Sequence, residues 1–376
     1  MSTDTPTSKA IVRIIASKDS WIEGEAIRQM EKTAELPGMI AAVGLPELHP
    51  GKGIPVGAVF AAEGIFYPYL IGNDVGCGMG LWKTDLKRRK VKRDKWVERL
   101  SDLDGPTDED ITPWLEEEGI TPSPSDLAIG TIGGGNHFAE LQQIEKVEDE
   151  ESANQLGLST DELMLFVHSG SRGLGEAIYR SHVEEHKAAG LIEGTEAAVR
   201  YLNQHDRALK WSRASRSVIA YRFLTALGAQ GERILDRCHN SIQAGIVSGK
   251  ACWLHRKGAV DSMEGATVVA GSRGTLSYLV IPAGDQELSL YSLTHGSGRK
   301  WKRGECKQRL RPRFSPETLI HTELGSRVIC EDKDLLYEEA PQAYKDVETV
   351  VMDLIKARLV RIVASLRPII TYKTRR

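Results

Sequence analysis

Histidine and glycine occur together at several points of this chain, an arrangement that favours chemistry at turns. Six of the ten histidines stand beside glycine, asparagine or arginine in polar contexts: His49, His137, His168, His239, His255 and His295. Glycine collects where the backbone turns tightly or approaches a ligand, so we expect the five glycine clusters of the chain to form strand–loop junctions around one cavity. Three other histidines have charged neighbours at helical spacing and are expected on a solvated helix face: His182, His186 and His205.

A carboxylate and a thiol lie three residues apart in the glycine-containing loop Asp74–Cys77. One loop of this kind can offer both groups to a cation, and a thiolate can bridge two cations. Together with His137, His168 and His239, the loop predicts an Asp/Cys/His₃ metal site. A buried structural cysteine with core histidines explains any one of these residues as well, but not all five in polar or glycine-rich turns. Mixed nitrogen, oxygen and sulfur ligands suit manganese, zinc or iron.

The segment His295–Arg299 places an imidazole beside a glycine turn whose N–H groups could hold phosphate. A histidine that attacks the α-phosphate of a nucleotide forms a phosphoramidate, and Arg299 could stabilise the charge that develops. The turns 133–136 and 271–274 could hold phosphate in the same way. The simpler alternative is a histidine in a tight turn. Neither a G-x-x-x-x-G-K-[ST] loop nor the K-x-D-G motif of familiar nucleotidyl-transferring ligases is present, so nucleotide chemistry would need another route.

Basic residues cluster in two runs, although the chain as a whole carries 49 basic and 52 acidic residues and a net charge of −3. Contact with nucleic acid would therefore come from local patches. The second run, 299–313, begins at the candidate nucleophile, where a polyanionic substrate would need to lie, and favours nucleic acid. The first run, 83–95, is equally consistent with a solvated face.

The elements that must position these residues are predicted to be mixed α and β. The longest apolar stretch, 54–72, is interrupted by two prolines and a glutamate, which favours buried strands over a membrane helix. A short apolar run at 163–167 predicts a strand that ends at His168. Alternating residues at 360–366 predict another strand, stopped by Pro368.

Helical spacing is found in two places. Ile219, Phe223 and Leu227 lie four residues apart within the long segment 196–243, and apolar residues recur in the same way at 347–354. No linker divides the chain, so we expect one compact α+β domain over residues 11–376 after a flexible N-terminus, residues 1–10.

The remaining features concern the surroundings of the protein. The acidic, proline-containing stretch 102–124 is expected to be a solvated excursion. Five scattered cysteines form no disulfide framework, and the N-terminus has no apolar core typical of a secretory signal. These observations favour a cytoplasmic protein with reduced thiols.

In their order along the chain, these motifs resemble those of the RtcB family of RNA ligases, which join RNA ends with GTP and manganese. The resemblance runs from about residue 39 to the C-terminus. It is carried by these strings: Gly57-Ala58-Val59, Asp74–Gly78, Gly130–Glu140, His168–Gly175, His239-Asn240, His255–Ala259, Gly271–Tyr278, His295–Arg299 and Glu339–Asp346.

The resemblance implies two manganese ions, one held by Asp74, Cys77 and His137 and the other by Cys77, His168 and His239. It also implies that His295 is the residue that becomes guanylylated. Positions that surround the guanine nucleotide in the family correspond to Asn136, His137, Phe138, Ala139, Glu140, His239, Asn240, Ala270, Gly271, Ser272, Arg273, Ser277, His295, Gly296, Ser297, Gly298 and Lys373.

The implied fold is a single α+β domain with mixed β-sheets and flanking helices around a deep metal-lined cleft. The implied activity is a GTP- and Mn²⁺-dependent ligation of RNA 3′-phosphate or 2′,3′-cyclic phosphate ends to 5′-hydroxyl ends, in RNA repair or tRNA splicing. The enzyme would pass GMP from a histidine to the RNA 3′-end. Neither a membrane nor DNA as the main substrate is expected, and the oligomeric state is left open.

Two other functions are compatible with the same residues. The first is a metal-dependent RNA phosphoesterase that never guanylylates, against which the intact His295 turn argues. The second is a non-catalytic RNA-binding protein, which leaves the complete ligand set unexplained.

The chain also departs from the family pattern. The family often has Asn at Gly76, Met at Arg273 and Ala at Ser297, and an Asp-Ala-His-type motif is replaced here by 47–49, Glu-Leu-His. None of these differences removes a metal ligand or the nucleophile, so the chain is expected to form a divergent branch, serving RNA repair more than tRNA splicing.

Overall fold

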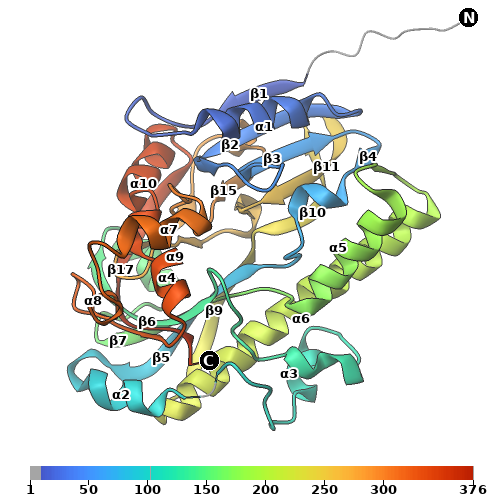
Figure 1. The fold of residues 1–376 in the computed structure, drawn as a ribbon. Coiled ribbons are helices and arrows are strands. Elements are labelled where there is room, and N and C mark those ends of the chain that lie inside the picture. The colour runs from blue at the N-terminus through green and yellow to red at the C-terminus, as the bar shows by residue number, and fades with distance from the viewer. Residues whose placement is uncertain (1–9, 102, 376) are drawn as a thin grey trace, which may run out of the picture.

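The computed structural model describes residues 10–101 and 103–375, which form two large β-sheets with helices around them (Figure 1). The fold is the single mixed α+β domain that was predicted. Apart from Ala10, the N-terminus expected to be flexible lies outside the described residues. Within them, no helix has the length and apolar character needed to cross a membrane, and the stretch 54–72 holds strands instead.

The smaller sheet has five strands, and helices pack on both of its faces. Its order is β1 (Ile11–Ile14), β2 (Met39–His49), β3 (Val56–Ala62), β11 (Lys250–Lys257) and β10 (Asn240–Val247). Helix α1 (Gly24–Ala34) buries Ala26 and Met30 against one face. Helix α10 (Val347–Lys356), predicted from its apolar spacing, buries Val350 and Leu354 against the other.

The larger sheet has seven strands hydrogen-bonded side by side. Its order is β13 (Thr267–Val269), β14 (Ser277–Pro282), β17 (Val360–Thr374), β6 (Phe138–Val147), β7 (Glu162–Ser169), β5 (Gly78–Lys87) and β9 (Gly231–Cys238). An eighth strand, β16 (Arg327–Cys330), pairs in parallel with the long strand β17. The predicted strand at 163–167 is the core of β7. Helix α6 (Glu196–Leu227) covers one face, where Ile219 and Phe223 pack against Leu165.

The other elements include two small strand pairs and seven further α-helices among the described residues, of which α5 packs on α6. Two small pairs are β4 (Ile65–Phe66) with β8 (Leu191–Ile192) and β12 (Ala259–Asp261) with β15 (Ser292–Thr294). The remaining α-helices are α2 (Arg93–Arg99), α3 (Thr112–Glu117), α4 (Glu150–Gln155), α5 (Gly173–His186), α7 (Arg303–Leu310), α8 (Pro316–Leu319) and α9 (Lys333–Glu338).

Strand β17 is longer than predicted, because Pro368 does not stop it. Proline lacks the N–H that a sheet ladder needs and is tolerated at bulges. Here the register between β17 and β6 shifts between Pro368 and Ile370, so the missing donor falls at an irregularity. The strand therefore continues to Thr374 and places Lys373 beside the cleft.

The helix predicted within 196–243 is confirmed only as far as Leu227. Gly228 adopts the left-handed conformation (φ 70°) that ends helices. The chain then turns back as β9 and enters β10. Periodicity could not place this end, because glycine alone does not show where a helix stops.

The stretch 102–124 is more anchored than predicted. It contains α3, and Leu115 and Ile120 are buried against Trp211 and Val218 of α6. Glu118 forms ion pairs with arginines of α6 and β9. The stretch is acidic overall, but a few apolar residues within it pack on α6, and the composition alone did not indicate this.

Two of the three histidines expected on a solvated helix face are buried, so that expectation was wrong for them. Nε2 of His205 accepts the backbone N–H of Ile242 at 3.0 Å. The ring of His182 faces the ring of Tyr201, with centroids 5.5 Å apart. Helices α5 and α6 pack on each other, which turns these positions inward, whereas His186 is partly exposed.

Candidate active site

The predicted metal ligands lie close together at the ends of four neighbouring strands of the larger sheet. Neighbouring strands here run antiparallel, so the starts of β5 and β6 meet the ends of β7 and β9. The loop Asp74–Cys77 leads into β5, and His137 leads into β6. His168 lies at the end of β7, and His239 joins β9 to β10 of the smaller sheet. The site therefore forms at the junction of the two sheets.

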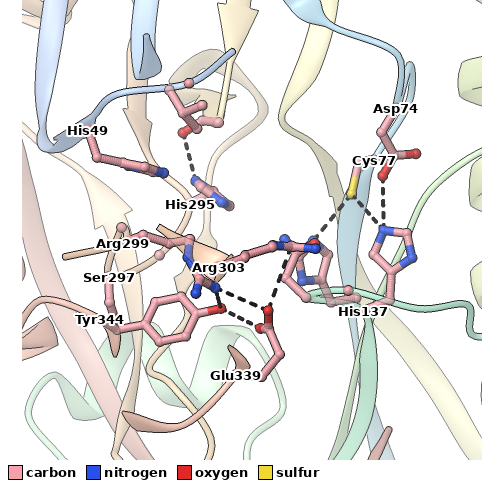
Figure 2. Close-up of a pocket in the computed structure, with 18 of the residues that line it drawn as sticks. His49, Asp74, Cys77, His137, His295, Ser297, Arg299, Arg303, Glu339 and Tyr344 are labelled. Atoms are coloured by element: carbon pink, nitrogen blue, oxygen red, sulfur yellow. Dashed lines mark hydrogen bonds and ion pairs between the residues drawn. The ribbon is translucent and has the colours of Figure 1, made fainter. Parts of the chain in front are cut away.

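Two groups of ligand atoms lie close enough for two cations, and Cys77 belongs to both. In the first group, His137 Nε2 lies 3.0 Å from Asp74 Oδ2 and 3.4 Å from Cys77 Sγ (Figure 2). In the second, His168 Nε2 lies 3.2 Å from Cys77 Sγ, and His239 completes the set within 4.8 Å. Metal bonds of about 2.0–2.3 Å need donor atoms at about this spacing.

The protonation of these groups fits a bound cation. Burial lowers the pKa of His168 and His239 well below the ordinary value, so both imidazoles are neutral, the form that binds metals. Although burial opposes its charge, His137 lowers the pKa of Asp74 to about 2. Burial and the Asp74 carboxylate raise the pKa of the Cys77 thiol, and a coordinated cation would displace its proton.

A further observation supports this fit. Nδ1 of His239 is buried and has no hydrogen-bond partner within residues 10–101 and 103–375. A buried nitrogen without a partner is unfavourable unless a ligand completes it. The donor set of nitrogen, oxygen and sulfur suits manganese, as well as zinc or iron.

Arg216 of α6 holds the loops that carry Asp74, Cys77 and His168 by hydrogen bonds to their backbone. The spacing of residues in the sequence did not identify it. Its guanidinium forms a buried pair with Asp236, with Nε 2.7 Å from Oδ2. Nη1 donates to the carbonyls of Gly76 (3.1 Å) and Ser169 (2.8 Å). An arginine among the apolar positions of a predicted helix was the signal in the sequence that this residue is buried. The sequence did not show its partners, because Gly76, Ser169 and Asp236 lie far from it in the chain.

Glycine leaves the space in which the Asp74 carboxylate lies. A Cβ on Gly170 would lie 2.1 Å from Asp74 Oδ1. Gly76 has φ 77°, and a Cβ there would lie 2.7 Å from Ser212 Oγ. The glycines of these two turns are therefore required by packing and backbone conformation around the metal ligands.

His295 follows β15 and is oriented by a buried carboxylate of β2. Its Nδ1 lies 2.8 Å from Glu47 Oε2 and 2.7 Å from the carbonyl of Gly258. Between two acceptors Nδ1 holds the proton, which leaves the lone pair on Nε2 in the neutral ring. Burial disfavours the imidazolium, but the negative charge of Glu47 and the hydrogen bonds of the ring to Glu47 and Gly258 together have a larger effect than burial, and the pKa of His295 is raised. The rings of His295 and His239 lie 4.4 Å apart.

One wall of the cleft carries several cations around a single buried carboxylate, Glu339. Arg299 Nη1 donates to Glu339 Oε1 and to Tyr344 Oη, each at 3.1 Å. Arg303 and Lys373 lie 3.7 and 3.9 Å from the same carboxylate. Burial lowers the pKa of Lys373 to about 8. Because three cations face one anion, this wall keeps positive charge for a phosphate.

Arg273 adds a further cation to this wall. It is buried beside the cleft, and Nη2 donates to the carbonyl of Leu336. Its Nε and Nη1 have no partner among the residues that the structure describes. The arginine at this departure from the family pattern therefore offers free donors where a nucleotide was expected.

The cleft has a volume of about 1360 Å³ and collects most of the nucleotide-binding positions expected from the resemblance. Those that line it are Asn136, His137, Phe138, Glu140, His239, Asn240, Ala270, Gly271, Ser272, Arg273, His295, Gly296, Ser297, Gly298 and Lys373. Side chains alternate along β6, so Phe138 and Glu140 face the cleft while Ala139 packs in the core behind. Ser277 also lies behind the wall, where its Oγ accepts the N–H of Gly271 at 3.1 Å.

The two basic runs occupy different places. Residues 299–303 of the second run line the mouth of the cleft. The first run lies on the end of β5 and on α2, and part of it lines a separate hollow.

Comparison with known proteins gives one consistent result. A family model described as "tRNA-splicing ligase RtcB" matches residues 29–109 and 121–374. The chain is 48% identical to the RNA-splicing ligase RtcB2 of Escherichia coli strain ATCC 25922, over 98% of this chain and 97% of that protein. It is 27% identical to the tRNA-splicing ligase RtcB of Archaeoglobus fulgidus, over 93% of this chain and 91% of that protein. The unmatched residues 110–120 include α3.

Proposed function

The chain belongs to the RtcB family, and from this premise we propose that it is an RNA ligase that uses GTP and manganese to join a 3′-phosphate end to a 5′-hydroxyl end. The observation that carries the proposal is the position of His295. It lies against the ligand groups for two cations, with its Nδ1 held by Glu47 and Gly258. A nucleophile and a site for phosphate charge therefore share one cleft.

The metal ligands would be Asp74, Cys77 and His137 for one ion and Cys77, His168 and His239 for the other. Manganese bound there would neutralise the triphosphate and favour attack at its α-phosphorus. The expected nucleotide positions, including Ala139 and Ser277 behind the wall, would shape the pocket for the guanine nucleotide.

In the first step, Nε2 of His295 attacks the α-phosphorus of GTP. An N–P bond forms, the bond to the β-phosphate breaks, and pyrophosphate leaves with the electron pair. The Nδ1 proton stays between Glu47 and Gly258 and stabilises the positive charge that the ring gains. The cationic wall with Arg299 and Lys373 would hold the departing phosphates.

In the second step, an oxygen of the RNA 3′-phosphate attacks the phosphorus of the histidine-bound GMP, and His295 leaves. The RNA 3′-end then carries an activated phosphate. The 5′-hydroxyl of the other RNA end attacks this phosphate, a 3′,5′-phosphodiester forms, and GMP is released. A 2′,3′-cyclic phosphate would first be opened by water to a 3′-phosphate. We place this reaction in the repair of broken RNA in the cytoplasm.

The test is to incubate the protein with α-labelled GTP and Mn²⁺ and then to separate it under denaturing conditions. We expect label on the protein that is labile to acid and stable to alkali, as a histidine–phosphate bond is, and its loss in His295→Ala. The same variant should fail to ligate both 3′-phosphate and cyclic phosphate ends. Ligation by His295→Ala would sink the proposal, and metal binding without label would favour the phosphoesterase.

A further inference from the structure

A second hollow, of about 740 Å³, lies outside the cleft and is lined by the first basic run. Its walls are residues 91–95, at the start of α2, and the turn 321–327 that leads into β16. The turn is rigid, since the hydroxyls of Thr322 and Ser326 lie 2.7 Å apart and the backbone closes around them. No step of the proposed reaction uses this hollow.

The hollow carries an excess of positive charge. The carboxylate of Asp94 pairs with Arg327 at 2.9 Å, and Glu323 is a second exposed carboxylate on the turn. Lys92, Arg93 and Lys95 are exposed, and none of them forms an ion pair with another described residue. Three cations around a hollow attract a partner with regularly spaced negative charge.

The hollow is fixed to the cleft through shared elements. Arg375 follows Lys373 by two residues, and its Nε donates to the carbonyl of Leu100 at the end of α2 (2.7 Å). A Cβ on Gly274 would lie 2.6 Å from Cβ of Thr322, so the turn beside Arg273 backs on the turn that lines the hollow. The elements that line the hollow are therefore in direct contact with elements that line the cleft.

The second basic run leads away from the cleft, and four of its cations are paired: Arg299 and Arg303 with Glu339, Lys307 with Asp334 and Arg309 with Glu305. It begins at the mouth of the cleft, follows α7, and ends at the exposed Arg311 and Arg313 before α8. Helices α7, α8 and α2 follow one another along one side of the molecule, and β16 after α8 contacts α2 (Figure 1). Helix α7 alone is about 12 Å long at about 1.5 Å per residue, so the hollow lies well beyond the nucleotide that reacts.

We propose that this hollow binds the phosphodiester backbone of the RNA substrate at a distance from the ends being joined. The substrate is then a long or folded RNA, not a short free end. The proposal rests on the proposed RNA ligation, since it extends a track of cations that begins at that site. RNA is favoured over an acidic peptide because α2 lies on the same side of the molecule as α7, whose first residues line the cleft (Figure 1).

The test compares the wild type with the triple variant Lys92→Gln, Arg93→Gln, Lys95→Gln. A matched control, Lys18→Gln, Lys32→Gln, Lys187→Gln, makes the same change in net charge on exposed lysines of other elements. Binding of a long hairpin RNA and of a short oligonucleotide is measured by fluorescence anisotropy over a range of salt concentrations. Ligation of the short oligonucleotides is measured in parallel.

For the triple variant we expect about tenfold weaker binding of the long RNA and a salt slope smaller by about 2 to 3, as for three lost phosphate contacts in the loop or the stem of the hairpin. Short-RNA binding and ligation should be unchanged, which also shows that the variant is folded. The proposal would be overturned if both RNAs lost affinity equally, if the control lost as much as the triple variant, or if binding of the long RNA did not change. It would also be overturned if an acidic peptide displaced the hairpin as effectively as unlabelled RNA. Absence of short-RNA ligation by the wild type would contradict the proposed function without affecting the binding comparison.

Discussion

At the scale of single residues, the cleft contains a carboxyl group that burial keeps from ionising normally. Burial raises the pKa of Glu140 to about 7, although Thr371 and the side-chain amide of Gln142 donate hydrogen bonds to it. The folded chain thus retains a proton that the unfolded chain loses near pH 4.5. Because the folded state binds more protons between about pH 4.5 and 7, this group lowers stability as the pH rises through that window.

We therefore expect Glu140→Gln to be more stable than the wild type at pH 8, by at most about 3 kcal/mol, and close to it at pH 4. The measurement is the free energy of unfolding from denaturant titration at both pH values, with metal chelated. A difference between the two proteins that does not change with pH would contradict the assignment.

Whether a residue of this site could be predicted from the sequence depends on whether its partners are near to it or far from it in the chain. Most of the ligand residues stand in or near polar or glycine-containing turns, and such turns are visible in a sequence. The partners of His205 and Arg216 are backbone groups of Ile242, Gly76 and Ser169, far along the chain, and no local pattern reveals such contacts. Residues held by distant backbone groups were therefore misplaced or not found.

At the scale of elements, α6 positions the metal loops through one buried ion pair. Removing only one partner of such a pair leaves a buried charge uncompensated. Arg216→Met should therefore lower the free energy of unfolding by about 3–5 kcal/mol and weaken manganese binding, because the carbonyls of Gly76 and Ser169 lose their donor.

The double variant Arg216→Met, Asp236→Leu separates these two effects. It removes both charges, so most of the stability should return, while the metal affinity should stay low. Chemical denaturation and metal titration measure the two quantities. Recovery of full metal affinity in the double variant would show that Arg216 does not position the loops.

Element boundaries show the same division between local and distant causes. The core of β7 and helix α10 were predicted because a short apolar run and helical spacing are properties of the segment itself. The end of α6 and the passage of β17 through Pro368 depend on a left-handed glycine and on a bulge opposite β6. Neighbouring strands decide such features, and a single sequence does not display them.

At the scale of the whole molecule, the metal site joins the two sheets, since His239 links β9 to β10. An ion that binds only the folded state stabilises it in proportion to the logarithm of its concentration over Kd. Manganese at about 100 times Kd should therefore add about 2.7 kcal/mol and raise Tm, and chelation should reverse the shift.

The control for this prediction is Cys77→Ser, which removes the ligand common to both groups. Its Tm should respond to manganese much less than that of the wild type, as followed by differential scanning calorimetry. An equal response in both proteins would mean that the ions bind elsewhere.

The division of the active site between two sheets also has a consequence for inhibition. The metal ligands belong mainly to the larger sheet, whereas His295 and Glu47 come from the elements of the smaller one and its neighbours. A small compound wedged between His239 and His295, whose ring centroids lie 4.4 Å apart, would separate the proposed nucleophile from the candidate metal ligands and would occupy positions expected to surround the nucleotide. Such a compound is therefore expected to compete with the nucleotide and to need no contact with the RNA.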